Sequence, residues 1–385
     1  MKANTFDAIV IGSGSVGVPT ASALAEHKLR VLVLDSRAST GQGSNKAAIG
    51  GVRATHSDGS KIKTCLRSLE IFSSWKEKYG DDIGWEKGGY MFPSYNESDE
   101  RLMRDLLKVQ KRFGLNIDWL DAAGIKKLVP GINAENLRGG TYSPDDGSAS
   151  TLLSTTAFHR RAKALGVEFR YNEAVASIET EKGKVKGVTT AKGKYSAPRV
   201  INAAGINAKE ICAMVRLDVP VTPDTHEAGI TEPVQKMFAP MVVDIRAEGD
   251  SKNYYFYQNA EGQIVFCLTP HPPKWGTDRT ATSHFLPTVA RRMINLLPRL
   301  SGVKVRRCWR GLYPMTPDGF PIIDFAGELE GFVMAVGMCG QGFMMGPGVG
   351  ELVARMVTGT LTAEDREVLK GYSSKRKFEG MEKFT

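Results

Sequence analysis

A glycine-rich turn near the start of the chain constrains the possible folds more than any other feature of the sequence. Gly12, Gly14 and Gly17 follow an apolar run at 6–11, and an alanine-rich helical pattern then leads to a second apolar run that ends at Asp35. In such a βαβ unit the first glycine permits a tight turn, the second lets the backbone approach a pyrophosphate, and the third lets helix and strand pack closely. The pattern predicts a dinucleotide site in which Asp35 binds a ribose. That carboxylate argues against NADP and leaves NAD and FAD open.

Composition places the chain among folded proteins large enough for two domains. Of its 385 residues 42% are hydrophobic, and the net charge of +9 is spread along the chain except for an excess at 370–377. We interpret this charge as solvated surface, and no motif indicates a nucleic-acid partner. No apolar run approaches the ~20 residues that span a bilayer, and Met1-Lys2 leads into the first strand without a signal peptide. We therefore expect a soluble, cytoplasmic protein without a transmembrane segment.

The cysteines give no sign of a cross-linked or metal-binding protein. Cys65, Cys212, Cys267, Cys308 and Cys339 are scattered, with no Cys-x-x-Cys pair and no histidine at ligand spacing. We expect reduced thiols, no disulfide framework and no metal site.

Hydrophobic periodicity along the rest of the chain predicts many helices and strands. The expected helices cover 59–79, 97–113, 121–129, 152–165, 206–214, 284–297 and 346–358. The expected strands cover 85–94, 116–120, 167–171, 174–179, 185–190, 194–195, 199–205, 304–313, 321–325 and 331–336, and 219–265 is typical of a mainly antiparallel sheet. A polar loop at 39–46 is long and glycine-rich, as functional loops often are.

Three motifs in order carry a resemblance to a known family. They are the glycine turn, the strand end Asn202-Ala203-Ala204-Gly205, and a C-terminal pair of segments at 316–324 and 337–351. Together they resemble the D-amino-acid oxidase superfamily of FAD enzymes, and the chain is most similar to the branch of sarcosine oxidase and proline dehydrogenase β subunits. The resemblance implies an α/β fold. A Rossmann-like, GR2-type FAD-binding domain would comprise 1–84, 145–218 and 314–385, and an inserted, mainly antiparallel substrate domain with flanking helices would comprise 85–144 and 219–313.

The resemblance also implies which residues hold FAD. We expect the cofactor-binding set to be Gly12, Gly14, Ser15, Val16, Gly17, Asp35, Ser36, Arg37, Ser44, Asn45, Lys46, Gly50, Gly51, Val175, Ala203, Ala204, Gly205, Gly311, Gly337, Gly340, Gln341, Gly342, Phe343 and Met344. Glycines at 337–342 would let the backbone approach the flat ring, and a helix beginning near Gly346 would point its positive end toward the reduced flavin.

Departures from the family bear on how the flavin is attached. The cysteine that holds covalent FAD in some relatives corresponds here to Gly311, and Cys308 lies three residues earlier, so we expect non-covalent FAD. The segment 138–147 lacks the histidine that carries FMN in related β subunits. A second, non-covalent FMN at a subunit interface stays open.

For the substrate, the resemblance implies an arginine that binds a carboxylate. Arg53 follows Gly50-Gly51 and is our expected anchor, with Arg310 as the alternative. On the strand that carries residues 254–257, side chains alternate between faces, and we favour Tyr255 and Tyr257 as the pair facing the substrate. His56 and His271 are candidates for moving a proton, although either could equally be a hydrogen-bonded structural residue.

The implied reaction is oxidation of the C–N bond of a secondary or N-substituted amino acid, of the sarcosine or proline type. Hydride would pass to flavin N5, and water would hydrolyse the imine. The oxygen-activating lysine of monomeric sarcosine oxidase corresponds to Phe266, which favours a dehydrogenase over an oxidase. The electron acceptor stays open, and the chain could be a subunit of a hetero-oligomer. Two alternatives remain: an FAD-dependent dehydrogenase of a 2-hydroxy acid or glycerol phosphate, and a non-catalytic flavin-carrying or electron-relay subunit.

Overall fold

A six-stranded sheet carries the N-terminal glycine turn. The computed structural model describes residues 4–383, so Met1 and Lys2 lie outside the described residues. The strand order is β18 (Ile322–Phe325), β19 (Phe332–Val336), β12 (Val200–Asn202), β1 (Ala8–Ile11), β2 (Val31–Leu34) and β8 (Glu168–Arg170). All neighbours are parallel except β18, which runs antiparallel to β19. The unbroken burial of β1, β2 and β19 is typical of strands covered on both faces.

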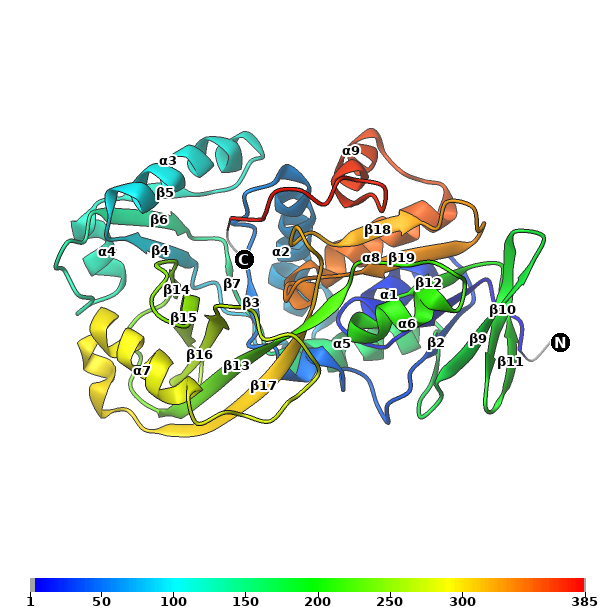
Figure 1. Ribbon diagram of the computed structural model, residues 1–385, viewed down its shortest axis with the longest axis horizontal. Helices are drawn as coiled ribbons and strands as arrows, with labels where there is room; N and C mark the ends of the chain where they lie inside the picture. Colours follow the sequence, from blue (N-terminus) through cyan, green and yellow to red (C-terminus); the bar gives the residue numbers. More distant parts are fainter. Residues whose placement is uncertain (1–3, 384–385) are drawn as a thin grey trace.

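Helices cover one face of this sheet and a smaller sheet lies toward the other. Apolar side chains of α1 (Gly17–Glu26), α2 (Gly59–Tyr79), α5 (Thr151–Ala164), α8 (Gly342–Thr358) and α9 (Ala363–Tyr372) pack with one face. The opposite face packs with α6 (Ala208–Ala213) and the three-stranded sheet of β9 (Val175–Glu181), β10 (Lys184–Thr190) and β11 (Gly193–Ser196). Figure 1 shows this layered unit in its right half, with β9–β11 at the far end.

A second, eight-stranded sheet forms the other half of the molecule. Its order is β17 (Val305–Met315), β13 (Thr222–Pro233), β16 (Gln263–Pro270), β15 (Ser251–Gln258), β14 (Met241–Asp244), β4 (Tyr90–Ser94), β6 (Gly139–Ser143) and β5 (Asp118–Leu120). Every described pairing is antiparallel except β14 with β4. Helices α4 (Ala122–Leu128) and α7 (Phe285–Leu296) pack on one face, and α3 (Glu97–Arg112) packs against residues of the other.

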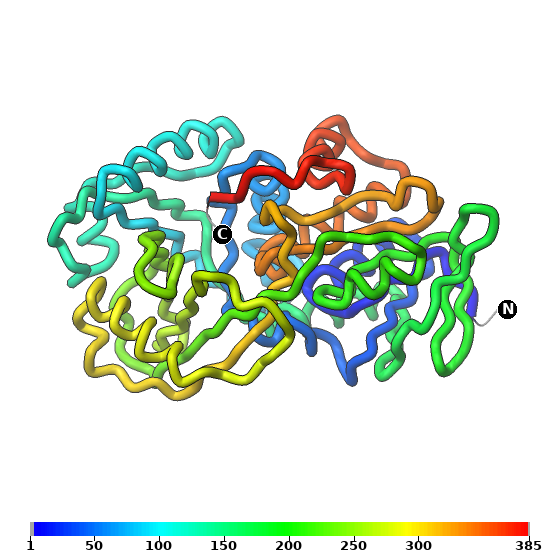
Figure 2. The backbone as a smooth tube through the Cα atoms, viewed as in Figure 1, coloured from blue at the N-terminus to red at the C-terminus, as the bar shows by residue number. Residues whose placement is uncertain are grey.

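Short elements complete the chain between the two halves. They are β3 (Gly51–Val52), which pairs with β7 (Gly147–Ser148), and three 3-10 turns, η1 (Ser44–Ala47), η2 (Gly205–Asn207) and η3 (Pro298–Gly302). The backbone tube in Figure 2 shows the chain crossing between the halves several times, and its C-terminal segment runs from α9 back to their boundary. Each half is therefore assembled from segments far apart in the sequence.

Local sequence explains why α2 begins and ends where the periodicity predicts. The Asp58 carboxylate accepts hydrogen bonds from the Ser60 and Lys61 amides at 2.8 and 3.3 Å, which satisfies two free donors at the helix start. At the other end, Gly80 adopts a left-handed φ of +82° that ends the helix.

Two predicted boundaries are wrong. Helix α8 begins at Gly342 rather than near Gly346. The sequence pattern indicated a loop because glycine is frequent there, but in the structure the glycines let the helix pack closely on its neighbours. The strand predicted at 85–94 comprises only Tyr90–Ser94, since Gly88 and Gly89 interrupt it and the latter takes a φ of +81°.

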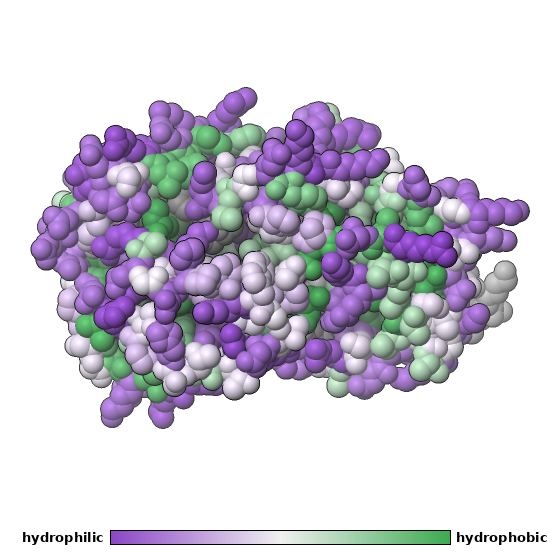
Figure 3. Space-filling model, viewed as in Figure 1, coloured by the Kyte–Doolittle hydropathy of each residue, from purple (hydrophilic) through white to green (hydrophobic). Residues whose placement is uncertain are grey.

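The face of the molecule seen in Figure 3 is largely polar. In Figure 3 hydrophilic residues cover most of the visible face, and apolar residues show mainly in smaller patches between them. Among the described helices, none combines the length and apolar character that crossing a membrane requires.

Candidate active site

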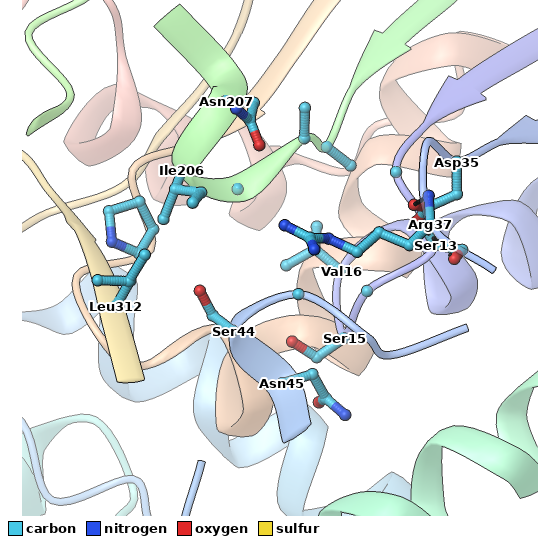
Figure 4. Close-up of a pocket in the computed structure, with 18 of the residues that line it drawn as sticks. Ser13, Ser15, Val16, Asp35, Arg37, Ser44, Asn45, Ile206, Asn207 and Leu312 are labelled. Atoms are coloured by element: carbon cyan, nitrogen blue, oxygen red, sulfur yellow. Dashed lines mark hydrogen bonds between the residues drawn. The ribbon is translucent and has the colours of Figure 1, made fainter. Parts of the chain in front are cut away.

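The larger of two adjoining cavities lies at the carboxyl ends of β1, β2 and β12. It has a volume of about 460 Å³, and its wall includes the glycine turn, the end of β2, the turn after β12 and the start of α8. Figure 4 shows Ser13, Ser15 and Val16 on one side of it, with Asn207 and Leu312 on other sides. Ligands of open α/β sheets bind at this edge, and the volume is that of a ligand pocket.

The three glycines of the turn have different structural roles. A Cβ atom on Gly12 would lie 2.5 Å from the Ala203 carbonyl oxygen, and one on Gly17 would lie 1.9 Å from the Gly12 oxygen. Both positions therefore require close backbone packing. A Cβ on Gly14 would meet no described atom within 4 Å, although Gly14 lines the cavity. This is the arrangement expected if a ligand rather than the protein approaches Gly14.

The Asp35 carboxylate is held in place at the end of β2. Its Oδ2 accepts hydrogen bonds from the Ser13 amide and hydroxyl at 2.7 and 2.6 Å, and its Oδ1 accepts one from the Arg37 amide at 2.8 Å. Asp35 and Arg37 both line the larger cavity, and in Figure 4 the Arg37 side chain extends from near Asp35 into it. The side chains are placed to meet a polar ligand.

Unpaired polar groups in the cavity walls fit the expected FAD. Within the described residues, Asn45 Oδ1 and Gln341 Oε1 are buried without a hydrogen-bond partner, and each residue lines one of the cavities. Buried polar atoms normally have partners, so both oxygens call for a ligand donor, such as a hydroxyl or ring N–H. Neither α1 nor α8 has a side-chain cap, which leaves amides at their starts for phosphate or ring oxygens.

The smaller cavity adjoins the larger one. Its volume is about 130 Å³, and Ala48, Tyr313, Gly340 and Phe343 line both. A flat ring at this junction would face both spaces.

Three cationic side chains line the smaller cavity, and no acidic residue among those described does. Arg53 comes from the segment after β3, Lys252 from β15 and Lys383 from the end of the described chain. Burial lowers the pKa of Lys252, and the charge of Glu382 opposes this shift. The positive wall suits an anionic group on a small ligand.

Buried neighbours fix the backbone beside Arg53. The guanidinium, which is 8% exposed, donates to the Thr55 carbonyl oxygen and lies 3.4 Å from His56 Nδ1. The Asp146 carboxylate accepts from the Ala54 amide at 2.9 Å and from the Thr55 hydroxyl at 2.5 Å. Burial raises the pKa of Asp146 to about 6, against the lowering effect of these hydrogen bonds.

The two predicted histidines lie away from both cavities. His56 is fully buried, and its Nε2 lies 3.3 Å from Cys65 Sγ. Burial, together with the charges of Arg53 and Lys61, places the pKa of His56 well below its usual value, so the ring stays neutral. His271 is exposed and lines neither cavity.

The strand tyrosines alternate between faces of the second sheet. Tyr255 lines the smaller cavity, and its hydroxyl lies 3.1 Å from that of Tyr313, where either group can donate. Tyr257 lies just behind the wall and donates to the Ile49 carbonyl oxygen at 2.5 Å. Tyr254 and Phe256 are fully buried in the core under α7. Burial raises the pKa of Tyr255 and of Tyr313, so both hydroxyls stay protonated.

The structure brings most of the predicted cofactor residues together. Those lining the larger cavity are Gly12, Gly14, Ser15, Val16, Asp35, Ser36, Arg37, Ser44, Asn45, Val175, Ala203, Ala204, Gly205, Gly311, Gly340, Gly342 and Phe343. Gly50, Gly51, Gln341 and Met344 line the smaller one.

Other predicted residues have a different place. Three predicted cofactor residues line neither cavity: Gly17, Lys46 and Gly337. Gly17 packs inside the glycine turn, and a Cβ atom on Gly337 would lie 2.5 Å from the Thr316 side chain. The Lys46 ammonium lies 3.5 Å from the Gln42 side-chain oxygen. Arg310, the alternative anchor, lines neither cavity and pairs instead with Asp278. Phe266 is buried in the core and stacks on Phe285.

No sequence pattern indicated that the C-terminal segment contributes to the smaller cavity. The Glu382 carboxylate accepts from the Ser57 amide and hydroxyl at 2.9 and 2.7 Å, and it lies 3.6 Å from the fully buried Lys61 ammonium. Burial alone would raise the pKa of Glu382, but Lys61 and Ser57 lower it. This anchor holds Lys383 in the wall of the smaller cavity, beside residues some 330 positions earlier in the chain.

A family model matches most of the chain. It is the DAO family, described as FAD dependent oxidoreductase, and the match covers residues 7–356. The match therefore includes the glycine turn, nearly all of α8 and every residue that lines the two cavities except Lys383.

Individual proteins are similar to the chain over most of its length, at 25–29% identity. The chain is 26% identical over 92% of its length to mouse (Mus musculus) mitochondrial sarcosine dehydrogenase, of which it spans only 40%. It is 25% identical over 92% of its length to glycine oxidase of Bacillus licheniformis, of which it spans 93%. The crystal structure of L-proline dehydrogenase from P. horikoshii is 29% identical with a TM-score of 0.90, and the match covers 96% of this chain and 97% of that one.

Proposed function

The chain belongs to the DAO family of FAD-dependent oxidoreductases, and from this premise we propose that it oxidises the C–N bond of a secondary or N-substituted amino acid. The observation that carries the proposal is the junction of the two cavities at Gly340 and Phe343, with Arg53 in the wall of the smaller one. A substrate held there would lie against the ring end of the cofactor. The names sarcosine dehydrogenase and L-proline dehydrogenase support a secondary amino acid, and the name glycine oxidase supports an amino-acid substrate without supporting N-substitution.

The carboxylate end of the substrate is assigned to Arg53. A guanidinium offers a planar pair of N–H donors that matches a carboxylate, and a buried pair of this kind is strong and directional. Asp146 supports the role because it ties down the backbone on the C-terminal side of Arg53. Lys252 and Lys383 add positive charge to the same wall.

The remaining residues would orient the amine and exclude water. When bound, FAD supplies the two-electron acceptor of the oxidation. The smaller cavity also presents apolar and aromatic surface from Tyr90, Phe92 and Met344. Because such surroundings disfavour a charge, they favour the neutral amine of the substrate over its ammonium form. The linked hydroxyls of Tyr255 and Tyr313 stay protonated and offer a hydrogen bond to a substrate heteroatom. The released imine would be hydrolysed by water.

We propose a dehydrogenase rather than an oxidase. The uncharged Met344 lines the smaller cavity, and Phe266, the position that corresponds to the oxygen-activating lysine, faces the core. The reduced protein should react slowly with oxygen and rapidly with an artificial dye, as stopped-flow reoxidation would measure. Equal rates with both acceptors would favour an oxidase.

Anaerobic bleaching of the flavin tests the proposed substrate class. Proline and sarcosine should bleach the bound flavin. Lactate and glycerol phosphate, which carry a hydroxyl group instead of an amine, should not. Bleaching only by a hydroxy acid or glycerol phosphate would support the alternative dehydrogenase. No bleaching by any of the four would support a flavin-carrying or electron-relay subunit and contradict the proposal.

The division of the chain into domains is part of the same proposal. All strands of the eight-stranded sheet lie within 90–143 and 222–315, which supports a substrate domain of 85–144 and 219–313. The FAD-binding domain would comprise 1–84, 145–218 and 314–385. A second FMN, partner subunits of a hetero-oligomer and a cytoplasmic location stay predictions from the sequence.

A further inference from the structure

An exposed loop of the second half sends one side chain into the larger cavity. Residues 271–284 connect β16 to α7, and every residue among them is exposed except Arg279, which is partly buried. Arg279 lines the larger cavity, whose other walls come mostly from the first half of the molecule. The loop therefore spans the boundary between the two halves.

Arg279 shares this cavity with a second arginine. Arg37 also lines it, and burial together with the Arg37 charge lowers the pKa of Arg279. Neither side chain forms an ion pair or hydrogen bond with any of residues 4–383. Two like charges that line one cavity without a counterion repel each other and destabilise the folded protein, unless an anion binds in the same cavity.

Arg310 contacts the residues on both sides of Arg279. Its guanidinium pairs with the Asp278 carboxylate at 3.1 Å and donates to the Thr280 carbonyl oxygen at 3.2 Å. Further along the loop, Glu227 on β13 accepts from the Thr282 amide and hydroxyl at 2.6 and 2.8 Å. The direction of Arg279 thus follows from a set of contacts to β13 and β17.

We propose that Arg279 binds the diphosphate of FAD together with Arg37, so that the 271–284 loop of the substrate half closes over the cofactor. The diphosphate carries the negative charge that two guanidiniums require, and its oxygens accept the paired N–H groups of arginine. The glycine turn supplies phosphate contacts from one side, and Arg279 supplies them from the other half of the molecule. The inference rests on FAD being the cofactor and not on the identity of the substrate.

Equilibrium binding of FAD to the apoprotein tests the proposal without any catalytic assay. The dissociation constant of Arg279→Gln should exceed that of the wild type by about 10- to 100-fold, because a charge-assisted contact is lost. Arg279→Lys should fall between them. Arg306→Gln is the matched control, since Arg306 is exposed on β17 and lines neither cavity. An unchanged dissociation constant for Arg279→Gln would overturn the proposal, whatever the melting temperature of its apoprotein.

Competition by fragments of the cofactor identifies the group that Arg279 binds. For binding to the wild-type apoprotein, ADP should compete with FAD much better than adenosine does. In Arg279→Gln, the advantage of ADP over adenosine as a competitor should largely disappear. If the substitution weakens ADP and adenosine equally, Arg279 contacts the adenine ring and the diphosphate assignment is wrong. Bleaching by amines is a separate measurement, so failure of the proposed activity and failure of this inference are distinguishable.

Trypsin gives a second readout of loop closure. Lys274 and Arg279 both lie in the exposed loop, and FAD should slow cleavage there in the wild type by immobilising Arg279. The same cleavage rate with and without FAD would contradict closure of the loop.

Discussion

A substitution at Gly14 should affect cofactor binding without affecting folding, unlike a substitution at Gly12 or Gly17. A Cβ at this position meets no described atom within 4 Å, so Gly14→Ala should leave the melting temperature of the apoprotein unchanged. FAD should bind at least about tenfold more weakly, because the methyl group occupies the space through which the phosphates approach the backbone. Equilibrium dialysis and thermal unfolding of the apoprotein measure the two effects.

Gly17→Ala is the contrasting variant. Its Cβ would lie 1.9 Å from the Gly12 carbonyl oxygen, so it should destabilise the apoprotein itself. If Gly14→Ala lowers apoprotein stability as much as Gly17→Ala does, the open space at Gly14 has no relation to a ligand.

His56 makes a testable contribution to the pH dependence of stability. Burial lowers its pKa below the unfolded value of 6.5, so the unfolded chain binds the proton more readily. The free energy of unfolding should therefore rise with pH through the window below about 6.5 and then level off. His56→Gln should flatten this part of the curve, as urea unfolding of both proteins between pH 5 and 8 would measure. A signal assigned to His56 by its loss in His56→Gln, and titrating near pH 6.5 in NMR spectra of the wild type, would contradict the neutral ring.

Sequence patterns predicted individual residues unevenly. Glycine spacing and the acidic residue after the second strand are local features, and they located Gly12, Gly14 and Asp35 at the cavity. No local pattern placed Tyr313, Lys252 and Lys383 at the smaller cavity, because each reaches it from a different part of the chain. His56 shows the converse: its distance of three residues from Arg53 indicated proximity, but the sequence could not show that its ring points into the core.

At the level of elements, α8 shows why glycine is an ambiguous signal. Cβ atoms on Gly346, Gly348 and Gly350 would lie 1.9, 2.4 and 2.7 Å from backbone atoms of Ser15, Thr64 and Pro19. Glycine is a poor helix former, and so the pattern favoured a loop up to Gly346. Tertiary packing overrides this preference, because only glycine lets α8 lie directly against α1 and α2.

Gly346→Ala should therefore disturb the cofactor site through the packing of two helices. The added methyl group collides with the Ser15 carbonyl oxygen, and overpacking of this kind costs about 1–3 kcal/mol. The melting temperature should fall by about 2–6 °C, and FAD content after purification should fall with it. Gly302→Ala is the control, because a Cβ there meets no described atom within 4 Å. Equal melting temperatures for the two variants would contradict close packing of α8.

For the whole molecule, the order of motifs along the chain predicted more than any one of them. The family resemblance gave the two-sheet architecture, because it spans the glycine turn, the strand end at 202–205 and the C-terminal glycines. The contacts near the boundary between the two halves could not be predicted from the sequence. Arg279 acts across it, because it lines the larger cavity from a loop of the second half. The Glu382–Lys61 pair joins the C-terminal segment to α2 within the first half, and only the fold brings these two distant parts of the sequence together.

The central claim concerns this boundary: a carboxylate held by Arg53 in one cavity places an amine beside the flavin end of the other. The direct measurement is the half-saturating concentration of proline or sarcosine for anaerobic flavin reduction, in the wild type, Arg53→Gln and the Arg306→Gln control. Loss of a buried charge-assisted contact costs about 3 kcal/mol, so Arg53→Gln should raise this concentration about 100-fold with FAD content unchanged. An unchanged half-saturating concentration, or no reduction of the wild type by either amino acid, would contradict the account.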